Sequence, residues 1–316
     1  MMHSVPHPRS GRSSPLPFHM LPFALFLAAA LIPGSVQTEE WDYTFQGEDW
    51  KGTCATGQRQ SPIDIRYDNV LEVNKDKPIT FINYDKLLPV TVSIGHHTVK
   101  VTPAVDYELA ITGGGLPGKY ILDSLHFHWG SEHLFEGYRF PLEAHFVHYK
   151  SIYNGTADAV AQNDPEGIAV LGVMFSYGKE NSELTQIEEG ARHGQTVLDL
   201  EKLLPSDTSR FFRYKGSLTT PGCSEVVIWT VFKVPVPLNE IQVAAFRGLM
   251  PEEEQLISTF RTVQKLNRRK VELWRTGSKN IWGFNKPKLS LLGVLRQYLK
   301  EKKEKKAGRG NFLTSW

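Results

Sequence analysis

The sequence predicts a single, mainly β domain that contains a few short helices. Between about Trp41 and Phe284, short segments rich in β-branched and aromatic residues recur between turn signals, and no linker, repeat or low-complexity run interrupts them. Of the 316 residues, 41% are apolar, which is enough for one large core, and 22% are charged. This composition argues against bulk disorder, collagen and a coiled coil.

The expected elements follow from these segments in chain order. Strands are predicted at 79–82, 90–101, 120–129, 142–149, 168–177 and 226–234. The glycine- and proline-rich stretch 113–118 marks a break between two of them. Helical patterns are few, and the best ones lie at 182–190, 197–203 and 238–248.

The N-terminal end does not follow this β pattern. Arg9 and Arg12 precede an apolar run at 23–32, and small residues follow it. This run is too short for a membrane span, which needs about 20 residues, so we interpret residues 1–36 as a cleaved secretory signal peptide. The alternative is an uncleaved signal anchor with the domain facing outside the cell. In either case we expect an extracellular protein, and a secreted one is preferred.

The domain itself is assigned to residues 37–287, and a basic, disordered tail to residues 288–316. The apolar pattern at 289–299 is that of an apolar-faced helix, and the run that follows it, residues 300–309 with five Lys, one Arg and two Glu, is typical of a solvated, disordered segment. Because the whole chain carries only +2, the body between its ends is faintly acidic. Nucleic-acid binding is therefore excluded, whereas the tail is predicted to contact acidic polymers or a membrane surface.

Two further features agree with export from the cell. Asn154, in Asn154-Gly155-Thr156, is a predicted N-glycosylation site. The chain has only two cysteines, Cys54 and Cys223, and an even pair in an oxidising compartment predicts one disulfide bond. The alternative is two buried free thiols.

The chemistry is concentrated between His126 and His148, where five of the eleven histidines lie. His126 and His128 are two residues apart on an apolar segment, and on a strand this spacing directs both imidazoles to one face. His145, on a second such segment, is the expected third ligand. Three imidazoles that leave one position open are typical of a catalytic zinc site, although imidazole also suits copper, nickel or iron.

Glu143, two residues before His145, is the expected outer partner of the site, because a carboxylate often accepts the second N–H of a metal-bound histidine. We interpret His133 and His148 as structural. A single histidine in a strand is usually a core residue. The metal site is therefore predicted from the combination of His126 and His128 with the Glu143–His145 pair.

These and other stretches resemble the α-class carbonic anhydrases of the secreted animal type. The matching stretches are Gln60-Ser61-Pro62-Ile63-Asp64, His126-Phe127-His128-Trp129-Gly130, Ser131-Glu132-His133, Glu143-Ala144-His145 and Ser217-Leu218-Thr219-Thr220-Pro221-Gly222-Cys223. The resemblance implies a large, twisted, mostly antiparallel central β-sheet. It also implies a lyase that reversibly hydrates carbon dioxide to bicarbonate and a proton by zinc-bound hydroxide, that takes part in pH regulation and that sulfonamide-type compounds inhibit.

The resemblance further implies individual roles. Zn(2+) is expected on His126, His128 and His145, and Thr219 is expected to accept a hydrogen bond from the zinc hydroxide while donating its own proton to Glu132. The residues expected to hold carbon dioxide are Val147, Val170, Leu218, Thr219, Thr220 and Trp229. A histidine is expected to carry the proton away.

His97 matches the position of this proton shuttle, whereas His96 is one residue away and is expected on the opposite face of a strand. Tyr43 matches a tyrosine that orders water near the metal. Ser124 departs from the family, which usually has a longer Gln there to orient the first zinc ligand, so metal affinity is expected to fall.

The segment 259–264 also departs from the family at Thr259 and Thr262, and only local effects are expected. One alternative remains open, a catalytically silent carbonic-anhydrase-like extracellular binding or matrix protein. Retention of the three histidines, Glu132 and Thr219 argues against it. A metalloprotease is disfavoured because the chain has no His-Glu-x-x-His helix.

Overall fold

A computed structural model describes residues 41–75, 77–95, 97–252 and 258–277. The predicted signal peptide, the predicted tail and His96 lie outside these residues. Within the described residues, no helix has the length and apolar character needed to cross a membrane.

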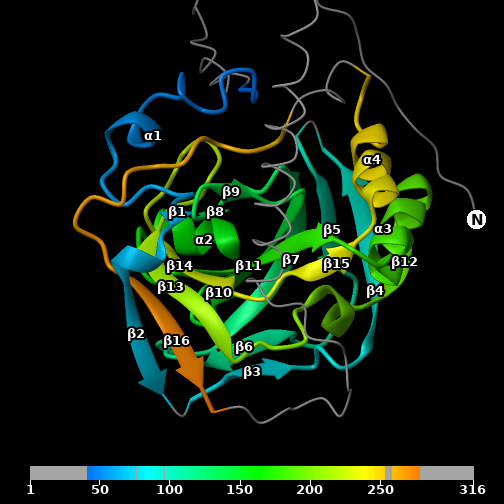
Figure 1. The fold of residues 1–316 in the computed structure, drawn as a ribbon. Helices are drawn as coiled ribbons and strands as arrows, with labels where there is room; N and C mark the ends of the chain where they lie inside the picture. The colour runs from blue at the N-terminus through cyan, green and yellow to red at the C-terminus, as the bar shows by residue number, and fades with distance from the viewer. Residues whose placement is uncertain (1–40, 76, 96, 253–257, 278–316) are drawn as a thin grey trace, which may run out of the picture. The chain divides into compact units, whose positions relative to one another are not determined.

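Two sheets make up the framework of the described domain (Figure 1). The main sheet has 13 strands in the part of the chain that the structure describes, and ten of them follow the order β12-β4-β5-β7-β10-β11-β14-β13-β16-β2. Those ten are β2 (Val70–Lys75), β4 (Leu87–Ile94), β5 (Val99–Pro103), β7 (Tyr120–Trp129), β10 (Leu142–Lys150), β11 (Ile168–Tyr177), β12 (Gln195–Asp199), β13 (Arg210–Gly216), β14 (Val227–Phe232) and β16 (Val271–Thr276).

Shorter strands attach to this order or form the second sheet. β3 (Ile79–Ile82) pairs with β6 (Ala110–Gly113), β6 pairs with β7, and β15 (Val236–Leu238) pairs with β11. The second sheet consists of β1 (Asp64–Ile65), β8 (Leu134–Phe135) and β9 (Tyr138–Arg139). In the main sheet only the pairs β11–β14, β11–β15 and β16–β2 are parallel among the described strands. The expected large, mostly antiparallel central sheet is therefore confirmed.

The central strands are apolar on both faces because both faces are covered. On β7, Leu125, Phe127 and Trp129 belong to one large buried cluster. The opposite face carries a second cluster, which includes Val170 of β11 and Trp229 of β14. Since successive side chains alternate between faces, His126 and His128 lie on the side opposite Phe127.

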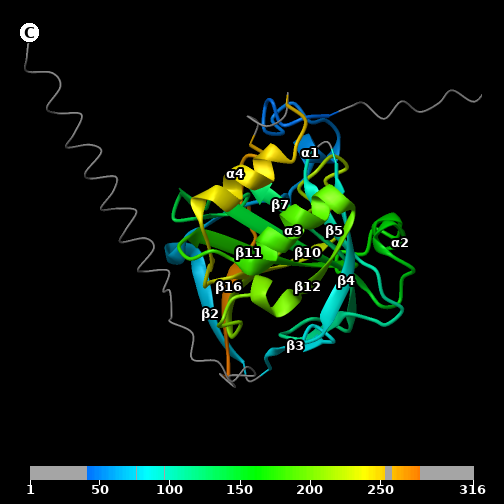
Figure 2. The same cartoon turned by 90° about the vertical axis from the view of Figure 1, so that its right-hand side faces the viewer.

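The helices are short and cover both faces (Figure 2). Their bounds are α1 (Thr53–Thr56), α2 (Thr156–Ala161), α3 (Ser182–His193) and α4 (Glu240–Gly248), and two 3-10 turns lie at Tyr67–Asn69 and Leu200–Leu203. α3 and α4 place Leu184 and Phe246 in the first cluster, whereas α2 places Ala159 in the second. α2 therefore packs on the side of the sheet that carries the histidines.

Two of the expected elements are wrong in detail. The stretch 90–101 is not one strand but the hairpin β4–β5, because the chain turns where Gly95 N–H donates to the Thr98 carbonyl at 2.9 Å. The helix expected at 197–203 is a strand, β12, followed by a 3-10 turn. Val197 and Leu198 pair with β4 at the edge of the sheet, and this tertiary pairing overrides their helical pattern.

Candidate metal centre

Strands β7 and β10 bring three imidazoles together. The two strands are antiparallel, and their register places His145 directly opposite His126. His128 lies two residues further along β7, on the same face. The ring centroids are 5.2 Å apart for His126 and His145, 5.0 Å for His126 and His128, and 4.6 Å for His128 and His145. The predicted trio therefore converges.

Hydrogen bonds fix which nitrogen of two rings faces the centre. His128 Nδ1 donates to the Thr259 carbonyl at 2.5 Å, and a carbonyl can only accept, so Nε2 keeps its lone pair. His145 Nε2 lies 2.8 Å from Glu143 Oε1, which leaves Nδ1 free of a proton in the neutral ring. Outer partners of this kind are usual for metal-binding histidines.

The donor set fits a zinc ion. The ligand nitrogens of the three histidines lie within 4.8 Å of one another. Zinc–nitrogen bonds of about 2.0–2.1 Å require these nitrogens to be somewhat closer, which a small adjustment of the side chains achieves. His128 Nε2 is buried without a hydrogen-bond partner among the described residues. Burial, assisted by the neighbouring imidazoles, lowers the pKa of His126 well below its usual range, and burial also lowers the pKa of His128. Neutral imidazole is the form that binds metal.

Ser124 makes no hydrogen bond to His126 among the described residues. Its hydroxyl instead donates to Asp123 Oδ2 at 2.8 Å. Ser124, Asp123 and Lys100 nevertheless line the cavity beside His126. Lys100 Nζ lies 3.9 Å from Asp123 Oδ2, so this side of the cavity carries charges of both signs.

Glu143 serves two histidines at once. Besides His145, it accepts hydrogen bonds from the backbone N–H of His133 at 2.9 Å and from His133 Nδ1 at 2.8 Å. Burial alone would raise the pKa of Glu143, but His133 and His145 hold this pKa well below its usual range. His133, Glu143 and His145 also meet the spacing of a metal cluster, but their mutual hydrogen bonds already account for it.

Glu132 is fully buried between the histidines and the loop that contains Arg261. Its Oε1 accepts the Arg261 backbone N–H at 2.9 Å. Its Oε2 lies 3.6 Å from His128 Nε2 and 3.9 Å from His145 Nδ1, and it has no hydrogen-bond partner among the described residues. The hydrogen bond expected from the Thr219 hydroxyl to Glu132 is therefore not formed in this structure, because Oε1 accepts from Arg261 and Oε2 lies beside the imidazoles without a partner among the described residues.

A cavity of about 380 Å³ opens onto the three histidines. Every residue expected to hold the substrate lines it, namely Val147, Val170, Leu218, Thr219, Thr220 and Trp229. The sheet register explains the apolar side, because Val147 of β10 pairs with Val170 of β11, which in turn pairs with Trp229 of β14. Neighbouring strands thus present one continuous apolar surface.

His97 lies in the same cavity, together with Tyr43. Its ring packs on that of Trp41, with centroids 4.0 Å apart, and lies edge-on to Tyr43 at 5.8 Å. Burial raises the pKa of Tyr43 well above its usual value, so this hydroxyl stays protonated. The structure therefore brings the predicted shuttle residue to the cavity.

Comparison with known proteins agrees with this geometry. The sequence model described as eukaryotic-type carbonic anhydrase matches residues 39–274. Carbonic anhydrase 4 of Rattus norvegicus is 35% identical over 277 residues, which cover 78% of this chain and 88% of the relative. Carbonic anhydrase 12 of Homo sapiens is 33% identical, covering 76% of this chain and 74% of the relative. Carbonic anhydrase 6 of Mus musculus is 31% identical, covering 87% and 93%.

The chain belongs to the eukaryotic-type carbonic anhydrases. It is thus an α-class carbonic anhydrase, a lyase, as the resemblance implied. The predicted disulfide is also confirmed, because Cys54 and Cys223 are joined with their Cα atoms 5.0 Å apart.

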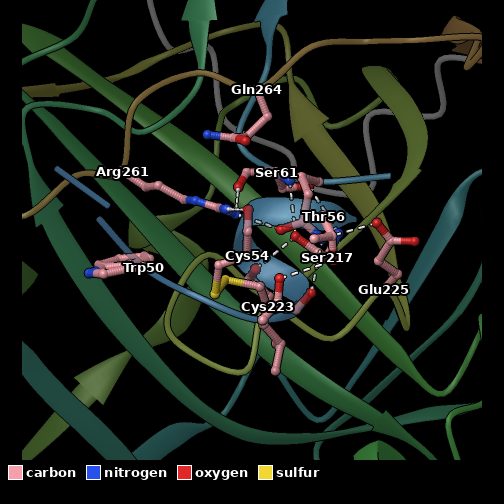
Figure 3. The surroundings of a disulfide bond; sticks show 12 residues. Trp50, Cys54, Thr56, Ser61, Ser217, Cys223, Glu225, Arg261 and Gln264 are labelled. Atoms are coloured by element: carbon pink, nitrogen blue, oxygen red, sulfur yellow. Dashed lines mark hydrogen bonds between the residues drawn. A yellow bond between two sulfur atoms is a disulfide. The ribbon is translucent and has the colours of Figure 1, made fainter. Parts of the chain in front are cut away.

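In this carbonic anhydrase the disulfide joins Cys54 to Cys223, as Figure 3 shows, and Cys223 ends the loop that also contains Thr219. Cys54 belongs to α1, and Cys223 ends the turn whose Cys223 N–H donates to the Thr220 carbonyl at 2.9 Å. Arg261 strengthens the junction, since its Nη2 donates to the Cys54 carbonyl at 2.8 Å and its Nη1 to the Ser61 carbonyl at 2.8 Å. Ser61 N–H in turn donates to Ser217 Oγ at 2.9 Å, at the start of the same loop.

Sequence reasoning missed two partners of the site. The Thr259 carbonyl orients His128, but a backbone acceptor that is 131 residues away leaves no side-chain signature in the sequence. The sequence predicts a structural role for His133, and in the structure this residue supports the site by hydrogen-bonding Glu143. The stretch Ser131-Glu132-His133 was the available signal for this role.

Proposed function

We propose that this chain catalyses the zinc-dependent, reversible hydration of carbon dioxide to bicarbonate and a proton. The convergence of His126, His128 and His145 at the base of the cavity carries the proposal. A zinc ion held by these three residues would supply a Lewis acid that makes a water molecule acidic near neutral pH, as zinc does in carbonic anhydrases generally.

The surrounding residues hold the ligands in the required state. The Thr259 carbonyl and Glu143 keep the protons of His128 and His145 on the nitrogens that face away from the centre. Glu132 Oε2 is buried without a partner, so it is available to accept the hydrogen bond that we assign to the Thr219 hydroxyl. Thr219 then uses its lone pair to orient the attacking oxygen.

The apolar side of the cavity suits a substrate without charge or dipole. Val147, Val170, Leu218 and Trp229 offer carbon dioxide a surface that binds water weakly, and Thr220 adds a polar edge where bicarbonate leaves. The same cavity is the expected site of sulfonamide-type inhibitors.

We assign the export of the proton to His97, and the ordering of the intervening water to Tyr43. An imidazole ordinarily titrates near neutral pH and therefore both takes up and releases a proton there. The position of His97 on the ring of Trp41, inside the cavity, supports this assignment.

We also propose that the protein works outside the cell, secreted after loss of residues 1–36. The disulfide supports this location, because such bonds persist in oxidising compartments. The tail 288–316 is proposed to contact acidic polymers or a membrane surface. Binding of the full chain to heparin or anionic vesicles is expected to weaken when residues 300–316 are deleted, and unchanged binding would refute this part.

Metal analysis combined with a carbon dioxide hydration assay tests the main proposal. Wild type is expected to hold one zinc per chain, and His128→Ala to lose both zinc and activity. His193→Ala, which removes an exposed histidine at the end of α3, is the matched control and is expected to keep both. An active wild type without zinc would refute the mechanism, and a zinc-loaded but inactive wild type would favour the silent binding protein.

A further inference from the structure

The predicted glycosylation site lies beside the cavity. Asn154 stands in the turn between β10, which carries His145, and α2. Asn154 is exposed, and its side-chain amide makes no hydrogen bond within the described residues. The amide nitrogen to which a glycan is joined is thus not engaged by the fold. In Figure 2, α2 projects at the edge of the described domain.

The other end of the same tripeptide faces inward. Thr156 lines the cavity of about 380 Å³ together with the three histidines, and its hydroxyl is buried without a hydrogen-bond partner among the described residues. α2 begins at Thr156 and places Ala159 in the cluster that holds Val147 and Val170. Asn154 therefore lies two residues before a residue that lines the cavity, next to the helix that packs on the apolar side. Two residues of extended backbone span at most about 7 Å.

Hydrogen bonds hold this turn in place. Asn154 backbone N–H donates to Asp158 Oδ2 at 3.0 Å, and Ser151 N–H donates to the Lys119 carbonyl at 2.9 Å. The Tyr153 hydroxyl donates to Asp164 Oδ2 at 2.9 Å. Gly155 adopts φ 145°, ψ 177°, a conformation essentially limited to glycine. A group attached to Asn154 therefore starts from a fixed point, two residues from the Thr156 side chain that lines the cavity.

We propose that Asn154 carries an N-linked oligosaccharide that stands at the mouth of the cavity and limits the size of the molecules that reach its base. The inference rests on the extracellular location in the proposed function. In the modification, Asn154 Nδ2 loses one proton and forms a bond to the first sugar, while the sugar–phosphate bond of a lipid-linked oligosaccharide donor breaks. A glycan is bulky and hydrated, so it obstructs large ligands while carbon dioxide and bicarbonate pass.

The test measures access to the cavity without using the metal or turnover. Lys100 lines the cavity and its side chain is 48% exposed, so Lys100→Cys introduces a thiol there. The two natural cysteines are joined to each other, which makes the new thiol unique. The variant is produced in a secretory eukaryotic cell with and without Asn154→Gln. Its reaction rates are then measured with N-ethylmaleimide and with a maleimide linked to poly(ethylene glycol).

Mass spectrometry is expected to show the glycan on Asn154 of the secreted chain. The polymer reagent is expected to react several-fold more slowly with the glycosylated Lys100→Cys protein than with the Asn154→Gln form, and N-ethylmaleimide equally fast with both. Gln186→Cys, on the exposed side of α3, is the control thiol and is expected to show no difference. Thr156→Ser keeps the glycosylation tripeptide and is expected to behave as wild type.

Glycosidase treatment of the folded Lys100→Cys protein gives the same comparison if Asn154→Gln fails to fold. A secreted chain without a glycan on Asn154, or equal polymer rates with and without the glycan, would overturn the inference. A chain that is not exported at all would overturn the extracellular location as well. Absence of zinc or of hydration activity would refute the proposed chemistry and leave these rates unaffected.

Discussion

Glu143 is the residue on which the orientation of His145 depends. Replacing it with Ala leaves the N–H groups of His133 and His145 without their common acceptor in a buried site. We expect Glu143→Ala to lower zinc affinity by about 10–100-fold, the usual cost of losing an outer partner. Competition with a zinc-binding dye measures this. Glu166→Ala, which removes a surface partner of Lys215, is the control, and equal affinities of the two variants would contradict the prediction.

His148 makes stability depend on pH. Its Nδ1 donates to the Phe146 and Ala169 carbonyls, so Nε2 accepts from the Tyr84 hydroxyl at 2.6 Å, and this arrangement requires the neutral ring. Burial lowers the pKa of His148 to about 4. An unfolded histidine has a pKa of about 6.5, so between these values the unfolded state binds more protons. The free energy of unfolding therefore falls as the pH is lowered through this window.

Replacement of His148 is expected to flatten this pH dependence. The free energy of unfolding of wild type should fall by up to about 3 kcal/mol between pH 6.5 and 4 because of His148. In His148→Gln the free energy of unfolding should change less with pH by that amount. Urea unfolding at a series of pH values measures the difference. His193→Gln, at an exposed histidine, should keep the wild-type slope. Parallel curves for wild type and His148→Gln would show that His148 does not contribute.

Side-chain patterns predicted the centre of the site better than its surroundings. His126 and His128 at alternate positions, and Glu143 two residues before His145, are local signals that a strand converts directly into geometry. The Thr259 carbonyl has no such signal, since any residue supplies a carbonyl. The missing hydrogen bond between Thr219 and Glu132 depends on the relative positions of two segments that are distant in the sequence, which the local sequence does not encode.

At the scale of elements, Gln242 couples two helices. It is the partner of the α4 N-cap residue Asn239, and its side chain also exchanges hydrogen bonds with the backbone of Asn181, the N-cap of α3. Gln242→Ala leaves the buried N–H of Asn181 unpaired and removes one of the two hydrogen bonds to its carbonyl, which still accepts the Thr185 N–H, so we expect a loss of about 2 kcal/mol. Urea denaturation tests this, with exposed Gln186→Ala as a control expected to change stability by less than about 0.5 kcal/mol. Similar losses for both variants would argue against the coupling.

The long central strands were predictable, and the strands near the edges were not. β7 and β11 coincide with their predicted segments because both of their faces are buried and both read as apolar runs. β2 has no buried residue and mixes apolar with polar side chains, and Arg213 and Lys215 interrupt the apolar pattern of β13, so the sequence predicts neither strand. These strands form because neighbouring strands of the sheet pair with them. Such pairing cannot be read from the sequence of the strand itself.

At the scale of the whole molecule, one covalent bond closes most of the domain. Cys54 and Cys223 are 169 residues apart, and chain entropy for a loop of that length predicts a stabilisation of up to about 5 kcal/mol. The double variant Cys54→Ser/Cys223→Ser is expected to unfold at a lower urea concentration. Reduced and alkylated wild type should match it. If oxidised wild type and the double variant unfold together, the bond contributes nothing to stability.

The same bond determines what a single cut in the backbone does. β7 and β10, with all three histidines, lie between Cys54 and Cys223 along the chain. A protease that nicks an exposed turn anywhere in that interval produces two fragments that stay tethered to each other. A nicked sample would therefore migrate as one species on a non-reducing gel and separate into two once a reductant is added. Proteolytic damage to the protein would thus escape notice on a gel that is run without a reductant.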